Sequence, residues 1–160
     1  MRCSVRALAL SAAASGAALS ALTGPVLADS EYRAAVLRVD APKPLPISRL
    51  DLPPADLGLA GAALGSADNA TTGRFLKQGF ATETVIATPE TAEAEMRRLA
   101  GAGIRYVVTL ADDAMTLKLA EAAGPDVLVV NAAAHGDRLR GADCRANLLH
   151  TAPSDAMIAD

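Results

Sequence analysis

Residues 104–114, with the sequence IRYVVTLADDA, constrain the fold more than any other stretch of the chain. A short run of β-branched, aromatic and aliphatic residues lies between glycines at positions 101 and 103 and acidic residues at positions 112 and 113. This pattern is typical of a central strand of a parallel sheet that leads directly into a helix. In an open α/β sheet, ligands bind outside the carboxyl ends of the strands. We therefore expect ligand contacts from the residues that follow this strand, which are Ala111, Asp112, Asp113 and Ala114.

The rest of the chain alternates between strand and helix patterns. Strands are predicted at residues 31–39, 82–87, 106–110 and 126–131, and helices at 57–80 with an interruption at 66–73, at 88–101 and at 113–123. Thr88 is the expected N-cap of the second helix, and Pro89 its first helical residue. Its buried face is expected to consist of Ala92, Met96 and Leu99. This alternation predicts an α/β fold of the Rossmann or flavodoxin-like kind, with a parallel sheet that helices cover on both faces.

Prolines and glycines mark the first part of the chain. Five of the nine prolines lie between residues 42 and 54, which excludes helix and favours a stiff, extended connection. An interdomain linker is the alternative, but too little chain precedes this segment to form a domain. Glycines at positions 58, 61 and 65 lack the spacing and the lysine of nucleotide-binding loops, so we expect them to allow close packing on the sheet.

The residues that follow the fourth strand reach the same edge of the predicted sheet. Those expected to contact a ligand are Asn131, Ala132, Ala133 and His135. At both loops a simpler role is the alternative. Asp112 can cap the next helix while Asp113 interacts with the helix dipole, and neither role needs a ligand. His135 can be a loop histidine that bonds to the backbone, and a single histidine is a poor indication of a metal site.

The first 28 residues have the pattern of a secretory signal peptide. Arg2 and Arg6 precede an apolar run at residues 7–22, and small residues at 26–28 suit cleavage before Asp29. A membrane anchor that stays in place is the alternative, but the run is short and rich in alanine for a span. We therefore expect an exported chain that is soluble after cleavage.

Charge and composition exclude several functions. Without Arg2 and Arg6, 13 basic residues remain against 18 acidic ones, a net charge of −5, which disfavours nucleic acid as a partner. No convincing catalytic set, metal site or cofactor site is indicated. Cys144 would be the one cysteine left after cleavage, so it is a buried thiol, an intermolecular partner, or half of a disulfide whose other half is missing. An exported α/β domain of this kind favours binding over catalysis.

Residues 98–108, RLAGAGIRYVV, enter the third strand in a way that resembles the type I periplasmic substrate-binding proteins of the Leu/Ile/Val-binding kind. Residues 47–58, ISRLDLPPADLG, and 68–75, DNATTGRF, are similar to the subgroup associated with pyrroloquinoline quinone-dependent alcohol oxidation. The resemblance covers the whole chain after residue 28. It implies a periplasmic protein whose two lobes close on a small-molecule ligand, with an ABC-type permease in the inner membrane as partner.

The resemblance also implies a division of the chain. Residues 1–28 form the signal peptide, 29–151 the first lobe, and 152–160 the truncated start of a second lobe, with residues 148–151 matching the first crossing strand. A helix that opens after Pro153 and stops at Asp160 predicts the front of a longer protein, in which a partner for Cys144 could lie downstream. We expect this chain by itself to bind ligand weakly or not at all.

In the amino-acid-binding members of the family, hydroxyl side chains and backbone N–H groups after the third and fourth strands hold the ligand carboxylate. Asp112 and Asp113 replace the hydroxyl side chains here, so a carboxylate would meet two like charges. We therefore expect a polyol, an alcohol-derived compound or a cation as ligand. The alternatives are an exported α/β enzyme or a sensory ligand-binding domain whose remaining half is missing, and a truncated reading frame without function.

Overall fold

The structure of the chain is a computed structural model that describes residues 30–42, 46–48, 50 and 52–160. The predicted signal peptide lies outside the described residues. Five strands form one sheet, in the order β2-β1-β3-β4-β5, and every pair of neighbours is parallel. The strands are β1 (Ser30–Val39), β2 (Gln78–Ala87), β3 (Tyr106–Leu110), β4 (Leu128–Asn131) and β5 (Leu148–His150). The predicted α/β fold with a parallel sheet is confirmed.

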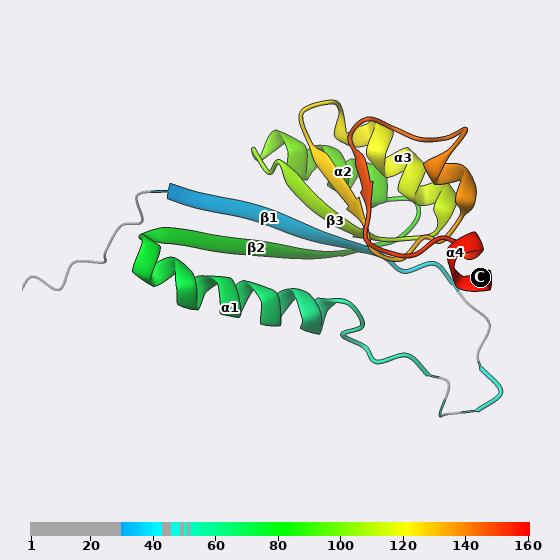
Figure 1. Ribbon diagram of the computed structural model, residues 1–160, viewed down its shortest axis with the longest axis horizontal. Helices are drawn as coiled ribbons and strands as arrows, with labels where there is room; N and C mark the ends of the chain where they lie inside the picture. Colours follow the sequence, from blue (N-terminus) through cyan, green and yellow to red (C-terminus); the bar gives the residue numbers. More distant parts are fainter. Residues whose placement is uncertain (1–29, 43–45, 49, 51) are drawn as a thin grey trace, which may run out of the picture.

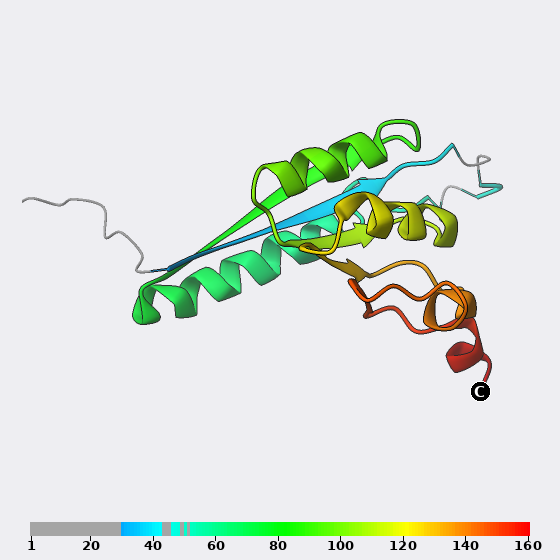
Figure 2. The same cartoon turned by 90° about the horizontal axis from the view of Figure 1, so that it is seen from above.

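The strand order places the helices on opposite faces of the sheet. Strand β2 lies on one side of β1, and the chain then crosses to β3 on the other side of β1. Because the crossovers are right-handed, a reversal in the direction of strand addition moves the next helix to the other face of the sheet. Figures 1 and 2 show α1 on one face and α2 and α3 together on the other. The helices are α1 (Leu59–Leu76), α2 (Ala92–Gly101), α3 (Asp113–Ala123), the 3-10 helix η2 (Asp137–Arg140) and α4 (Asp155–Ala159). Among the described residues, none of these helices has the length and apolar character that crossing a bilayer requires.

The hydrophobic core lies between the sheet and the pair α2 and α3. Alternate residues of β1, β3 and β4 point to this side, as the two-residue period of a strand requires. The predicted buried face of α2 is confirmed. Each fully buried branched side chain contributes about 1.5–3 kcal/mol by its removal from water. The largest of the fully buried apolar residues are Leu37, Met96, Leu99, Ile104, Leu119, Val107, Val127 and Val129.

The opposite face of the sheet is covered only in part. Helix α1 packs against β2 at one end of the sheet (Figure 1), whereas Tyr106 of β3 and Leu149 of β5 are 53% and 52% exposed. Helix α1 also runs through residues 66–73 without the predicted interruption, since the turn-forming residues there cost about 1 kcal/mol or less each in a helix. Gly73 is its buried residue, and a Cβ atom there would clash with the carbonyl oxygen of Gln78.

Helix α2 starts later than the local sequence signals predict. The helix begins at Ala92 with Thr91 as the N-cap, so the prediction of Thr88 and Pro89 was wrong. The carbonyl of Thr88 accepts from the N–H groups of Thr91 (3.1 Å) and Ala92 (2.9 Å), and the N–H of Thr88 donates to Oγ1 of Thr91 (3.1 Å). These bonds close a separate turn ahead of the helix. Strand β2 begins earlier than predicted and β4 later, while α3 has its predicted bounds.

Candidate functional site

The order of the strands reverses between β1 and β3, and this reversal locates the candidate site. In doubly wound sheets the ligand crevice opens at such a point, outside the carboxyl ends of the two strands. A cavity of about 330 Å³, here called the crevice, lies at this position. Its lining comes from the ends of β1 and β3, the start of α3 and three loops. The lining residues are Arg38, Val39, Asp40, Ala41, Leu57, Pro89, Leu110, Ala111, Asp112, Met115 and Ala133.

Asp112 is both the cap of α3 and a wall of the crevice. Its backbone is extended (φ −72°, ψ 174°), and its Oδ1 atom accepts a hydrogen bond of 2.8 Å from the N–H of Met115. The capping alternative for Asp112 is therefore confirmed. The cap uses one carboxylate oxygen, so Oδ2 is left for a partner in the crevice, where Asp112 is an exposed lining residue.

Asp113 connects the loop after β3 with the loop after β4, the two loops in which ligand contacts were predicted. Its Oδ1 atom accepts a hydrogen bond of 3.0 Å from the N–H of Gly136, in the loop after β4. A Cβ atom at position 136 would overlap the Asp113 carboxylate, so a larger residue there would require that side chain to shift. The two loops border a second, open hollow of about 470 Å³ beside the crevice. It is lined by Asp112, Asp113, Ala114, Ala133, Ala134, His135, Gly136 and Asp155.

Asn131 shapes the loop after β4 from behind. Its side chain is 0% exposed, and Oδ1 accepts hydrogen bonds from the N–H groups of Ala133 (3.1 Å) and Ala134 (2.8 Å). Its Nδ2 atom donates to the carbonyl of Ala134 (2.7 Å) and lies 3.1 Å from Nδ1 of His150. The structure thus places Asn131 as a positioning residue, and neither Asn131 nor Ala132 lines the two hollows.

His135 has the simpler of its two predicted roles. Its ring lies at the surface, with Nδ1 2.7 Å from the carbonyl oxygen of Pro153. The carbonyl of His135 in turn accepts a hydrogen bond of 2.8 Å from the N–H of Asp155 at the start of α4. These bonds hold the segment after β5 against the loop after β4. Within the described residues, no group of three or more potential ligands of the His, Cys, Asp and Glu types could hold a metal ion.

Strand β1 and the proline-rich loop also contribute to the crevice, which was not predicted from the sequence. The Arg38 guanidinium, whose side chain is 14% exposed, donates from Nη1 to the carbonyls of Ala55 (2.8 Å) and Leu57 (3.3 Å). It also donates from Nη2 to Oδ2 of Asp40 (3.0 Å), and its Nε atom lies 2.9 Å from Oδ1 of that residue. Arg38 therefore fixes the loop that closes one side of the crevice. The signal available in the sequence was a charged pair, Arg38 and Asp40, at the end of an apolar strand.

The charges in the crevice leave a negative excess. Arg38 is neutralised by Asp40, whereas Asp112, at the N-terminal end of α3, takes part in no ion pair among the described residues. The remaining walls are apolar, with Val39, Leu110 and Met115 among them. Such a site suits a small ligand that has an apolar part and a hydroxyl or ammonium group.

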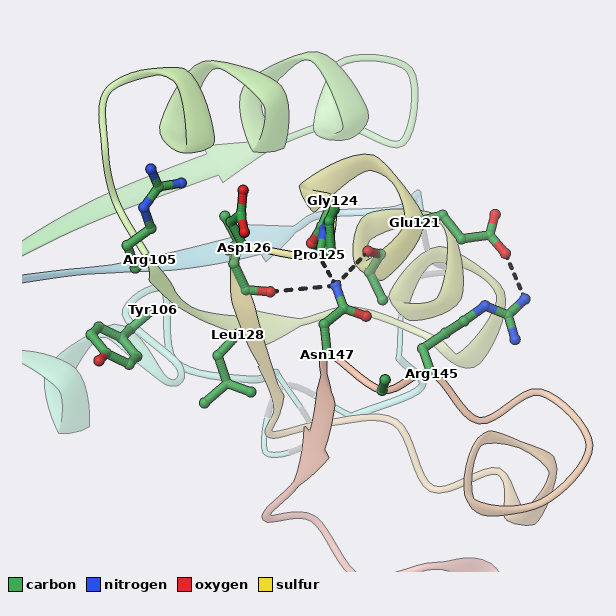
Figure 3. A pocket seen from close by; sticks show the side chains of 12 residues that line it. Arg105, Tyr106, Glu121, Gly124, Pro125, Asp126, Leu128, Arg145 and Asn147 are labelled. Atoms are coloured by element: carbon green, nitrogen blue, oxygen red, sulfur yellow. Dashed lines mark hydrogen bonds and ion pairs between the residues drawn. The ribbon is translucent and has the colours of Figure 1, made fainter.

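A larger hollow, of about 930 Å³, lies at the opposite edge of the sheet (Figure 3). Asn147 there donates from Nδ2 to the carbonyls of Ala120 (2.8 Å), Gly124 (3.0 Å) and Val127 (3.3 Å). Arg145 pairs with Glu121 at 2.6 Å. These groups satisfy one another and close the end of α3, so they do not converge on a ligand. We therefore assign the site to the crevice. It is smaller than this hollow, but it lies at the strand-order reversal and polar groups line it.

Cys144 directly precedes Arg145, which lines this larger hollow, and its side chain is exposed. The buried-thiol alternative for Cys144 is therefore wrong. Its other two alternatives, an intermolecular partner and a disulfide with a residue elsewhere, stay predictions.

Comparison with known proteins supports the fold. No family model and no curated protein sequence matches the chain. Among solved structures, it is similar to the leucine-, isoleucine-, valine-, threonine- and alanine-binding protein from Brucella ovis in its closed conformation, with a TM-score of 0.54 and 18% sequence identity. The likeness covers 77% of this chain and 32% of the other, so the chain spans about a third of the length of that protein. The sheet and its helices have the architecture of one lobe of a type I periplasmic binding protein.

Proposed function

We propose that this chain is the first lobe of an exported solute-binding protein, which holds a small ligand in the crevice and delivers it to an ABC-type permease. The observation that carries the proposal is the crevice itself. It opens at the strand-order reversal, and its polar side chains come from the end of β1 and from the start of α3. The structural neighbour is a binding protein, which supports recognition without chemistry.

The ligand of this crevice is an alcohol-derived compound, a polyol or an amine rather than an amino acid carboxylate. Asp112 carries the excess charge, and an approaching carboxylate would be repelled by it. A hydroxyl or ammonium group can donate to the free oxygen of Asp112, while Leu110 and Met115 contact the apolar part. The Brucella protein is an amino-acid-binding protein, so we propose that this chain differs from it in the class of ligand.

The wider biological setting rests on the sequence pattern. The signal-like residues 1–28 support export to the periplasm, and residues 29–151 and 152–160 correspond to a first lobe and the start of a second. The segments at 47–58 and 68–75 support a link to pyrroloquinoline quinone-dependent alcohol oxidation. Part of the first segment borders the crevice, because Arg38 holds the carbonyls of Ala55 and Leu57.

Thermal unfolding of the 160-residue chain tests the proposal against a panel of glycerol, ethylamine, leucine, pyrroloquinoline quinone, Ca²⁺ and La³⁺. We expect glycerol or ethylamine to raise the Tm more than leucine does, and Asp112→Ser to reduce that rise. One lobe supplies only part of an interlobe site, so the effect should need millimolar ligand; submicromolar binding would contradict this arrangement. If leucine gave the largest rise and Asp112→Ser changed nothing, the proposed ligand class would be wrong.

A further inference from the structure

The orientation of the Asn131 amide is fixed by its surroundings. Oδ1 accepts hydrogen bonds from two backbone N–H groups, those of Ala133 and Ala134, so the other end of the amide must be the NH₂ group. One N–H of this group donates to the carbonyl of Ala134. The second N–H points to Nδ1 of His150 in β5, 3.1 Å away.

This contact fixes the protonation state of His150. An NH₂ group can only donate, so Nδ1 of His150 must accept and must be free of a proton. The neutral ring therefore carries its proton on Nε2. A doubly protonated ring would place Nδ1–H against the N–H of Asn131, and the contact would be lost.

The groups that face the ring disfavour its charged form. Burial lowers the pKa of His150 below its ordinary value of 6.5, the positive charge of Arg140 in η2 lowers it further, and the bond to Leu139 opposes both. Asn131, from β4, is neutral. Because the folded state disfavours the imidazolium, the contribution of this contact to stability is present above pH 6.5 and is lost as the pH falls below it.

We propose that the contact between His150 and Asn131 is a pH-sensitive support of the crevice, so that protonation of His150 releases the loop at residues 132–135 and lowers ligand affinity. Asn131 is the residue through which the ring acts, because its amide holds Ala133, and Ala133 lines both the crevice and the second hollow. The effect on ligand rests on the proposed function of the crevice. The effect on the loop does not.

The chain contains two histidines, which supplies a matched control. Nδ1 of His135 faces the carbonyl oxygen of Pro153, which can only accept, so Nδ1 donates and this bond does not need an unprotonated nitrogen. His135→Gln should therefore leave the pH response of the loop intact. His150→Gln, whose amide oxygen can accept from Asn131 at any pH, should abolish it.

Nitrogen and amide NMR of the 160-residue chain between pH 8 and pH 5 tests the loop. In the His135→Gln variant, we expect His150 to be the Nε2–H tautomer at pH 8, and the Ala133 and Ala134 amide signals to move with its titration. In the double variant with His150→Gln, those signals should stay in place. A proton on Nδ1 of His150 at pH 8, or loop signals that ignore its titration, would overturn the proposal.

The same pH series with glycerol and ethylamine tests the consequence for binding, since neither compound changes charge over this range. We expect the Kd to rise toward acid pH by at most about tenfold per pH unit, the limit for uptake of one proton, and to be constant in the double variant. A pH-independent Kd beside a responsive loop would refute the link to affinity. Absence of binding at every pH would refute the proposed function instead, and the loop measurement would then decide this inference alone.

Discussion

Asp112 has two roles that substitutions can separate. As the N-cap of α3 it needs an acceptor oxygen, and as the charged wall of the crevice it needs a negative charge. Asp112→Ala removes both. Asp112→Asn keeps the acceptor, because asparagine is as good an N-cap as aspartate, and removes only the charge.

The capping role predicts different stabilities for the two variants. Asp112→Ala loses the hydrogen bond to the Met115 N–H and should lower the free energy of unfolding by about 1 kcal/mol, a fall of roughly 3–5 °C in Tm. Asp112→Asn should cost roughly 0.3 kcal/mol or less, because the cap survives and Asp113 still supplies a negative charge in the first turn. Urea denaturation followed by circular dichroism measures both changes.

The charged role predicts the same loss of cation binding in both variants. If the ammonium group of ethylamine interacts with Asp112, removal of the charge should weaken ethylamine binding by about 1 kcal/mol, which is about fivefold in Kd. Asp126→Asn is the matched control, since it removes another exposed carboxylate, at the opposite edge of the sheet. The reasoning fails if Asp112→Asn is as unstable as Asp112→Ala, or if Asp126→Asn weakens ethylamine as much as Asp112→Asn does.

Three further predictions concern the framework of the site. Arg38→Met should free the proline-rich loop, seen as faster proteolysis between residues 46 and 57 with the sheet intact; an unchanged cleavage rate would contradict its proposed role. Gly73→Ala should lower stability by about 1–3 kcal/mol, because its Cβ meets backbone, whereas Gly61→Ala in the same helix meets nothing within 4 Å and should be neutral or stabilising; equal effects in urea denaturation would refute this packing. Asn147→Ala should cost about 1–3 kcal/mol through the carbonyls that it leaves unpaired at the end of α3, and a change within 0.5 kcal/mol, roughly the range of a surface substitution, would show that water replaces it.

Local chemistry explains why some elements were predictable. Residues 106–110 are a bounded apolar run, and α3 has an aspartate cap ahead of an amphipathic segment, so both features are encoded within a dozen residues. Thr88 and Pro89 carry an equally good local signal for a helix start, yet hydrogen bonds between two threonines close a turn first. The cap at Thr91 is visible only once that turn is known.

The full site could not be predicted because it depends on which strands are neighbours. Pairing of β1 with β3 brings Arg38 and Asp40 to the crevice, although they lie about 70 residues before Asp112 in the sequence. No local sequence pattern indicates which strands pair over such a distance. Asn131 was found as a polar residue after a buried strand. Its role as a support, with every side-chain group bonded, depends on His150 in the neighbouring strand β5.

The most direct test of the account is to locate a bound ligand. Amide shifts of the 160-residue chain can be mapped while glycerol, ethylamine and leucine are added in turn. We expect ethylamine or glycerol to move the signals of Ala111, Asp112, Met115 and Ala133 most, and Asp112→Asn to reduce these shifts. Largest shifts around Arg105 and Arg145, in the hollow at the opposite edge, or tighter binding of leucine that ignores Asp112→Asn, would contradict it.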